Sequence, residues 1–419
     1  MARRLLIAFL VALPACTDLG TGTPPNSSVT LSDLSVGWNH TCGLLPDSVA
    51  VCWGSNLNHE VGPDTAFAQP RPVRVSSNQI FSQVTAGPGI SCGIGGPGAG
   101  RALCWGVLYD YDVGNWGSDT AFAMDTIHTF AKVVAGQTTC ALTLQDEAYC
   151  WGTNYFGELG QGNGDSTSTR VPQSISGFQF TQISIGGAHV CALTTAGAAY
   201  CWGDNTFGQL GNTAVAPDTA CGFFHNNRCL RSPVPVEGGL TFRSVSAGQF
   251  FTCGLTTAGR IYCWGANQWG QLGTMDSLSL CQVSRPAGTD HDLPKPCSTS
   301  PRPLAASGAA FIQVSAGRNH ACAVRDNTLA YCWGSNESGQ LGTAGAPDSC
   351  YAGSCRKAPT GVADGNLAVA KISAGFWHTC AISIDALVFC WGNNLYGELG
   401  SGSAGGSSSS PVLVEAPAP

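Results

Sequence analysis

Charged side chains are scarce in this sequence. Asp, Glu, Lys and Arg make up 11% of the 419 residues, roughly half of the usual share of about 25%. No basic run is longer than Arg3-Arg4, and the formal net charge is −7. Because binding to a phosphate backbone requires clustered lysine and arginine, this composition argues against a nucleic-acid partner.

Long apolar runs are missing beyond the N-terminus. There, a basic pair precedes the apolar stretch Leu5–Leu13, which is too short to span a bilayer. Leu13-Pro14-Ala15-Cys16 follows and resembles a bacterial lipobox, in which the cysteine becomes the lipid-modified first residue. We therefore expect residues 1–15 to be a lipoprotein signal peptide, and residues 16–30 to be the lipidated Cys16 and a flexible tether. The alternative is ordinary cleavage near Ala15, which leaves Cys16 as an odd thiol.

Two short motifs of common enzymes are absent as well. The sequence contains no His-Glu-x-x-His and no P-loop, which are the local signatures of metalloproteases and of nucleotide-binding enzymes. We expect no cofactor, no resident metal and no catalytic residue. A propeller hydrolase or lyase remains the minor alternative, since such enzymes assemble their sites from scattered loops.

Cysteine, in contrast, is abundant. Setting Cys16 aside leaves 20 of the 21 cysteines, and an even number in an exported chain indicates a disulfide framework. The tripeptide Cys-Trp-Gly occurs seven times, and each copy follows another cysteine by ten positions, or by twelve in the second copy. The seven predicted hairpin bridges are Cys42-Cys52, Cys92-Cys104, Cys140-Cys150, Cys191-Cys201, Cys253-Cys263, Cys322-Cys332 and Cys380-Cys390. The remaining six cysteines form three local pairs in the longest repeats, Cys221-Cys229, Cys281-Cys297 and Cys350-Cys355.

The loops between the paired cysteines predict tight antiparallel hairpins. Cys191 and Cys201 centre on Thr195-Ala196-Gly197, and glycine in the third place suits a type I turn that is followed by a left-handed residue. The two cysteines then face each other across the strands, within disulfide reach. A zinc site is disfavoured, because the sequence has no pair of Cys-x-x-Cys motifs.

The repeat period predicts the architecture. The Cys-Trp-Gly copies are 46 to 69 residues apart in the sequence, and no copy is long enough to fold alone, so neighbouring copies must bury one another. Several short strands in each copy indicate an all-β, seven-bladed β-propeller of four-stranded antiparallel blades over residues 31–419. The C-terminal Pro411-Val412-Leu413-Val414 has no partner in its own copy by this count. We expect this strand to complete a blade begun at the N-terminus, which closes the ring and leaves no open edge.

Three recurring segments carry a family resemblance. Ala-Gly-x-x-His-x-Cys-x-Leu, Tyr-Cys-Trp-Gly-x-Asn and Gly-Gln-Leu-Gly resemble the regulator of chromosome condensation repeat, over essentially residues 32–414. The resemblance implies a seven-bladed propeller, related in fold to a secreted bacterial propeller that inhibits β-lactamase. Other members are exchange factors for a nuclear GTPase, but export and the cysteine-stapled blades make that role improbable here. We transfer no residue roles from the family.

Strand order predicts where a site would lie. In a four-strand blade the first and third connections share one rim, and the four tryptophans outside Cys-Trp-Gly, including Trp38 and Trp377, all fall on those connections. The predicted binding rim consists of Trp38, Phe250, Phe251, Arg318, Phe376 and Trp377, contributed by copies 5, 6, 7 and 1. Rigid aromatic and arginine side chains favour a protein contact surface. Packing of the aromatics between blades is the alternative, and it is favoured for Phe207, Trp269, Tyr155 and Tyr396.

Four histidines share one place, two residues before the first hairpin cysteine: His40, His189, His320 and His378. Ring-related positions stand far apart, so we expect local hydrogen bonding in place of a metal site. Together these observations predict an exported, lipid-anchored, monomeric binding propeller of the cell envelope, at the outer membrane or cell surface. Its expected ligand is a protein, and a glycan of the cell wall or environment is the alternative.

Overall fold

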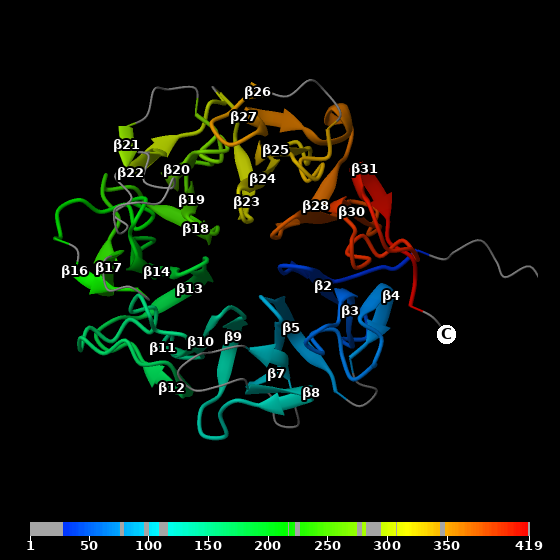
Figure 1. Cartoon of the computed structure of the whole chain (residues 1–419), viewed down its shortest axis with the longest axis horizontal. Helices are drawn as coiled ribbons and strands as arrows, with labels where there is room; N and C mark the ends of the chain where they lie inside the picture. The colour runs from blue at the N-terminus through cyan, green and yellow to red at the C-terminus, as the bar shows by residue number, and fades with distance from the viewer. Residues whose placement is uncertain are drawn as a thin grey trace, which may run out of the picture.

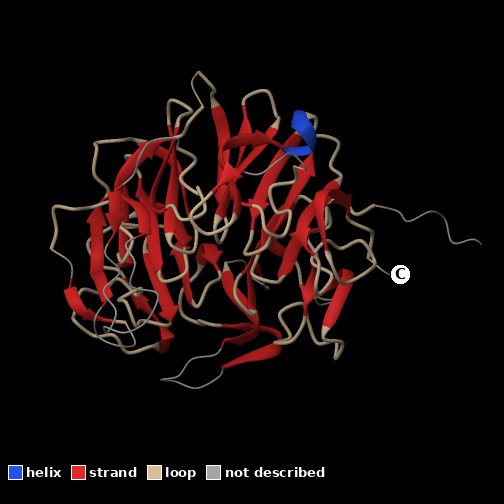
Figure 2. Cartoon of the chain, turned by 45° about the horizontal axis from the view of Figure 1, so that its top comes forward, coloured by secondary structure: helices blue, strands red, loops and turns tan. Residues whose placement is uncertain are grey.

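A computed structural model describes residues 28–417, apart from 76–78, 96–99, 109–115, 217, 223–226, 275–278, 282–294, 307 and 344–347. The predicted signal peptide and Cys16 lie outside the described residues. The described chain forms seven antiparallel sheets around a central axis, as Figure 1 shows, and strands are its main secondary structure, as Figure 2 shows. The predicted all-β propeller of seven blades is therefore confirmed. In the part of the chain that the structure describes, no helix has the length and apolarity needed to cross a membrane.

Four blades contain four strands in sequence order. Blade 1 consists of β1 (Asp33–Val36), β2 (His40–Leu44), β3 (Ala50–Ser55) and β4 (Ala68–Arg74). Blade 2 consists of β5 (Phe81–Ala86), β6 (Ile90–Gly95), β7 (Arg101–Leu108) and β8 (Trp116–Ala123). Blade 3 consists of β9 (Phe130–Val134), β10 (Thr138–Thr143), β11 (Ala148–Gly152) and β12 (Thr169–Ser174). Blade 7 consists of β28 (Val369–Ala374), β29 (His378–Ser383), β30 (Val388–Asn393) and β31 (Ser407–Leu413).

The other three blades have a fifth strand, which corrects the expectation of four strands throughout. Blade 4 consists of β13 (Phe180–Ile185), β14 (His189–Thr194), β15 (Ala199–Asp204), β16 (Asp218–Cys221) and β17 (Asn227–Pro235). Blade 5 consists of β18 (Phe242–Ala247), β19 (Phe251–Thr256), β20 (Ile261–Ala266), β21 (Ser279–Cys281) and β22 (Lys295–Pro303). Blade 6 consists of β23 (Phe311–Ala316), β24 (His320–Arg325), β25 (Ala330–Ser335), β26 (Asp348–Ser349) and β27 (Ser354–Gly361), followed by the short 3-10 helix η1 (Val362–Gly365). The fifth strand is always part of an insertion that a local disulfide closes.

All ten predicted cysteine pairs are bonded in the structure, seven in the hairpins and three in the insertions. In the hairpin of blade 4, Cys191 lies directly opposite Cys201, with their Cα atoms 4.1 Å apart. Gly197 closes the turn with a φ of 75°, the left-handed region that glycine adopts without strain. Its N–H donates to the Thr194 carbonyl. The spacing of the cysteines thus predicted the hairpin geometry correctly.

The closure of the ring differs from the prediction. Strand β31 hydrogen-bonds with β30 and is the outermost strand of blade 7, while blade 1 uses its own β4. The Pro70-Arg71-Pro72-Val73 segment of β4 supplies the strand that seemed to be missing. Val73 lies opposite Cys52 as Val234 lies opposite Cys201, so Pro72-Val73 is the Pro-Val segment that the prediction overlooked. Blades 1 and 7 instead join through packing and short bridges.

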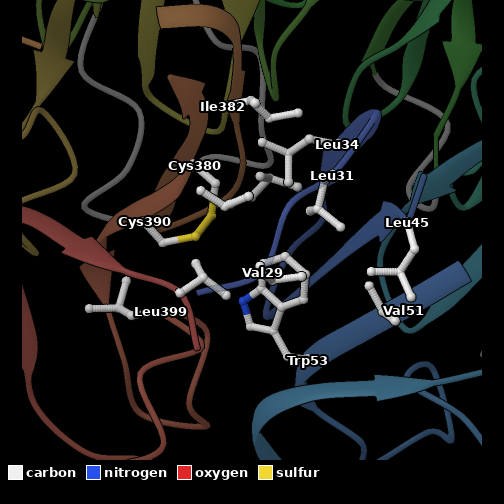
Figure 3. Packing of buried hydrophobic residues seen from close by; sticks show 13 residues of the cluster. Val29, Leu31, Leu34, Leu45, Val51, Trp53, Cys380, Ile382, Cys390 and Leu399 are labelled. Atoms are coloured by element: carbon white, nitrogen blue, oxygen red, sulfur yellow. A yellow bond between two sulfur atoms is a disulfide. The ribbon is translucent and has the colours of Figure 1, made fainter. Parts of the chain in front are cut away.

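Residues assigned to the tether take part in this closure. Ser28 bridges Glu415, Thr30 bridges Leu387, and the Val29 N–H donates to the Val414 carbonyl. Figure 3 shows Val29 and Leu31 beside Trp53 of blade 1 and the Cys380-Cys390 pair of blade 7, in one buried cluster. The propeller therefore begins by residue 28, and not at residue 31 as predicted.

The Cys-Trp-Gly tryptophans join neighbouring blades. All seven are fully buried, and six donate Nε1–H to a carbonyl in the third connection of the preceding blade, as Trp264 does to Gln209 O at 2.8 Å. In five blades the acceptor is the backbone carbonyl of the Gln or Glu in a Gly-Gln/Glu-Leu-Gly segment, and in blade 1 it is that of Glu60 at the equivalent position. Trp151 follows blade 2, whose third connection lacks this segment, and its Nε1 has no partner among the described residues. The repeated motif is therefore an inter-blade fastener.

Candidate binding site at the channel mouth

The first connections of all seven blades surround one end of the central channel. They line a cavity of about 110 Å³ whose wall is mostly glycine and alanine, from Gly37 of blade 1 to Gly375 of blade 7. In several blades, the residue that follows the glycine of the first connection donates its backbone N–H to a glycine carbonyl of the following blade. Arg318 donates in this way to Gly375 O at 3.0 Å, and Phe376 donates to Gly37 O at 3.1 Å. The backbone thus forms the ring, and the side chains that follow each glycine are left to line it.

Four of these rim side chains form one continuous group, which we name the mouth cluster: Trp38, Arg318, Phe376 and Trp377. The Trp38 and Phe376 ring centroids are 4.5 Å apart, across the junction of blades 1 and 7. The Phe376 and Trp377 rings meet nearly edge to face, at 5.3 Å and 80°. The Arg318 guanidinium lies 4.2 Å from the centroid of each of these two rings. All four side chains are half-buried, so they are held in place and still present a surface.

Arg318 is fixed from a third side. Its Nε donates to Gln249 Oε1 of blade 5 at 2.8 Å, so the planar group is oriented as well as stacked. Burial lowers the pKa of Arg318 and Glu337 opposes this effect, but arginine stays charged in proteins. The contacts therefore run from blade 5 through blades 6 and 7 to blade 1. The structure brings four of the six predicted rim residues into mutual contact.

The two phenylalanines of blade 5 are separated. Phe250 is half-buried, and its ring lies 5.5 Å from that of Phe207 in the preceding blade. Phe251 is fully buried in the core between blades 5 and 6, so its assignment to the binding rim is wrong. The reason is its position: it occupies the place of the repeated histidine, two residues before the hairpin cysteine, and that side chain points between the blades in every copy that has histidine.

Two of the four aromatics that were expected to pack between blades, Phe207 and Trp269, contact a neighbouring blade. Phe207 is buried beneath Phe250, and the Trp269 Nε1 lies 3.2 Å from the side-chain oxygen of Asn319, once that amide is correctly oriented. Tyr155 and Tyr396 are half-buried. The side chain of Trp116 lies outside the described residues, as do Tyr109 and Tyr111.

The four repeated histidines are buried and bonded across blade junctions. Each Nε2 lies 2.8 to 2.9 Å from a hydroxyl of the next blade, in the pairs His40–Ser91, His189–Thr252, His320–Thr379 and His378–Thr41. Three of the hydroxyls donate to the same carbonyls that accept the tryptophan Nε1–H, so in those pairs Nε2 carries the hydrogen. Burial lowers the pKa of all four histidines to about 3. The predicted local hydrogen bonding of these histidines is what their contacts show.

Two exposed leucines lie on the same rim as the mouth cluster, and sequence reasoning missed them. Leu57 of blade 1 is 50% exposed and Leu395 of blade 7 is 58% exposed, each directly after the asparagine that starts the third connection. The same place holds Thr206, Gln268 and Glu337 in blades 4, 5 and 6. Comparing this place across the copies would have shown that apolar residues occur there in the blades that supply Trp38, Phe376 and Trp377.

Fold and rim together define the protein's class: a disulfide-stapled seven-bladed propeller with a one-sided aromatic and cationic patch at its channel mouth. The RCC1-like domain family model matches residues 100–418, and the model of the regulator of chromosome condensation (RCC1) repeat matches residues 32–60. The chain belongs to the RCC1-like domain family.

Its relatives differ widely in length. The ultraviolet-B receptor UVR8 of Arabidopsis thaliana is 28% identical over 382 residues, which cover 88% of this chain and 78% of that protein. The human E3 ubiquitin-protein ligase HERC2 is 27% identical over 372 residues, which cover 84% of this chain and only 7% of HERC2. The structure resembles that of Prp20p from Saccharomyces cerevisiae, with a TM-score of 0.67 at 20% identity, over 84% of this chain and 83% of that chain. These structural likenesses concern the fold alone.

Proposed function

We propose that this protein is a non-catalytic binding propeller of the cell envelope, exported and held to a membrane by lipid on Cys16, that captures a protein ligand at its channel mouth. The observation that carries the proposal is the continuous contact of Arg318, Phe376, Trp377 and Trp38 across the junctions of blades 6, 7 and 1. Aromatic and arginine side chains dominate the energetics of protein interfaces.

Rigidity supports the proposal. The mouth cluster sits on short connections between strands that disulfides and inter-blade hydrogen bonds hold, so little conformational entropy is lost when a ligand binds. Exposed aliphatic residues on the opposite rim, such as Ile384 and Leu144, occur in separate hairpins, and scattered apolar residues are ordinary on protein surfaces. The ten disulfides fit an oxidising compartment, which agrees with export.

The cavity chemistry favours binding over catalysis. Of the described residues that line the cavity, only Arg318 is ionisable. General acid–base chemistry needs a positioned group that titrates near the working pH, and an arginine beside aromatic rings is not such a group. The residues of the mouth are therefore suited to recognition.

A pull-down from envelope extracts tests the proposal. The tagged mature domain should retain a partner that the Phe376→Ala variant retains at least about tenfold less well, since interface anchors contribute roughly 2 kcal/mol or more each. Ile384→Ala, a change in the same blade on the opposite rim, is the matched control and should leave capture unchanged. Equal capture by all three proteins, with melting temperatures that show folded variants, would refute the assignment of the mouth. A specific signal on a glycan array in place of protein capture would replace the proposed ligand class.

A further inference from the structure

The mouth cluster contains a cation whose hydrogen-bonding groups are only partly used. Arginine has five N–H donors in a planar fork, and the Nε–H of Arg318 is bonded to Gln249. Neither Nη atom donates a hydrogen bond to any described residue, and neither is a buried atom left without a partner. The four Nη donors of Arg318 therefore remain accessible at the rim of the channel.

The surroundings of Arg318 make this cation stand out. The chain carries a formal net charge of −7, yet the one ionisable side chain among the described residues of the cavity wall is positive. Phe376 and Trp377 both lie against the guanidinium, 4.2 Å from each ring centroid, and shield part of it from water. A charge that is held in a fixed place and partly desolvated interacts more strongly with an opposite charge than an arginine free in water does.

The cavity is large enough to admit a side chain. Its volume of about 110 Å³ is several times the roughly 10 to 15 Å³ needed to hold one water molecule, so a carboxylate and the methylene that carries it can enter. The planar shape of the carboxylate also matches the guanidinium fork, which binds carboxylates through two parallel hydrogen bonds.

We infer that the channel mouth is an acidic side-chain receptor, in which an Asp or Glu on a protruding loop of the protein ligand enters the cavity and pairs with Arg318. The inference rests on the proposed function and names the recognition chemistry of that site. Trp38, Phe376 and Trp377 contact the apolar residues that flank the acidic side chain. Gln249 is a positioning residue, since it orients the guanidinium without needing to touch the ligand.

Selection of phage-displayed random loop peptides on the whole mature protein tests the inference. Selected peptides should carry Asp or Glu at one shared position, and replacement of that residue by its amide should weaken binding at least about tenfold. Arg318→Gln should cause a similar loss, while Arg318→Lys should restore part of the affinity because it keeps the charge and loses the fork. Arg325→Gln is the matched control, since Arg325 lies over Tyr331 in the same blade but in the hairpin of the opposite rim.

The outcomes separate this inference from the proposed function. Peptides that lose binding to Phe376→Ala but bind Arg318→Gln as well as the parent protein overturn the acidic receptor and leave the binding face in place. Peptides in which phosphoserine at the shared position binds more tightly than Glu also overturn it. A selection that yields no peptide sensitive to Phe376→Ala counts against the proposed function itself. Melting temperatures of the Arg318 variants close to that of the parent protein establish that any loss reflects recognition.

Discussion

The buried pair His320–Thr379 allows a sharp test of how the blades are joined. The Thr379 hydroxyl accepts from His320 Nε2 at 2.9 Å and donates to Gln340 O at 2.9 Å, and both side chains are fully buried. Thr379→Ala removes this hydroxyl. Gln340 O keeps its bond from Trp391 Nε1, so the group left without a partner is the His320 Nε2–H.

The magnitude follows from these contacts. A buried donor without a partner costs about 1 to 3 kcal/mol, and the lost methyl group adds roughly 1 kcal/mol of packing. We therefore expect Thr379→Ala to lower the free energy of unfolding by about 2 to 4 kcal/mol. The junction of blades 5 and 6 shows an apolar replacement for this pair. Phe251 and Ala321 occupy the equivalent positions there, and both are fully buried.

The double variant His320→Phe with Thr379→Ala copies that junction. Replacing both polar partners by apolar groups leaves no donor without a partner, so the double variant should be more stable than the sum of the two single changes predicts, by about 1 to 2 kcal/mol. Guanidinium unfolding followed by tryptophan fluorescence near pH 7.5 measures all four proteins of this cycle. Additive losses, or a double variant less stable than either single one, would refute the description of the junction as an exchangeable pair.

Four further predictions concern pH, the buried tryptophans, the disulfides and the lipid anchor. Burial lowers the pKa of the four junction histidines from about 6.5 to about 3. Between these two pH values the unfolded chain binds more protons than the folded chain, so the folded state loses stability as the pH falls. We expect the free energy of unfolding to decrease by about 2 kcal/mol for each histidine between pH 6.5 and pH 5. Burial raises the pKa of Asp204 to about 6, and this carboxyl group opposes the decrease. Comparing the unfolding of His320→Phe/Thr379→Ala with that of the parent protein at pH 6.5 and pH 5 gives the contribution of His320 alone. Trp264→Phe should cost about 1 kcal/mol more than Trp151→Phe in denaturant unfolding, because only Trp264 donates to a described carbonyl. Mass spectrometry of the unreduced mature protein should find ten bridges, none of them between blades. Cys16→Ser should move the protein from the membrane fraction to the soluble fraction, and unchanged fractionation would contradict lipid anchoring.

Much of the fold could be predicted from the sequence because its periodic features report local geometry. Paired cysteines ten residues apart can face each other only across a tight hairpin, and Gly197 stands where the turn needs a positive φ. The closure could not be predicted in the same way. The Pro-Val pattern occurs in the outer strands of both blade 1 (Pro72-Val73) and blade 7 (Pro411-Val412), so it does not say which sheet each strand joins, and the bridges of Ser28 and Thr30 are single contacts with no repeat to reveal them.

The junction pairs show a signal that comparison of the copies could have found. Wherever one copy has histidine at the repeated position, the next copy around the ring has Ser or Thr directly before its first hairpin cysteine. Where the histidine is Phe251, that next residue is Ala321, and where it is Thr138, the next is Val190. Reading each position together with its partner in the next blade would have placed Phe251 in the core and removed it from the binding rim.

The same comparison separates residues that build the ring from residues that remain for function. In the first connections, the glycines and the backbone N–H groups after them make the inter-blade contacts, as between Phe376 N and Gly37 O. The side chain directly after each glycine is not needed for these contacts, and it varies among the seven copies: Trp38, Pro88, Gln137, Gly187, Gln249, Arg318 and Phe376. If packing alone determined this position, seven equivalent junctions would favour one type of residue, as they favour tryptophan in Cys-Trp-Gly. The aromatic and cationic residues gather instead on adjacent blades, in mutual contact around one side of the channel. This asymmetry on a symmetric scaffold is what a binding site for one partner in one orientation requires.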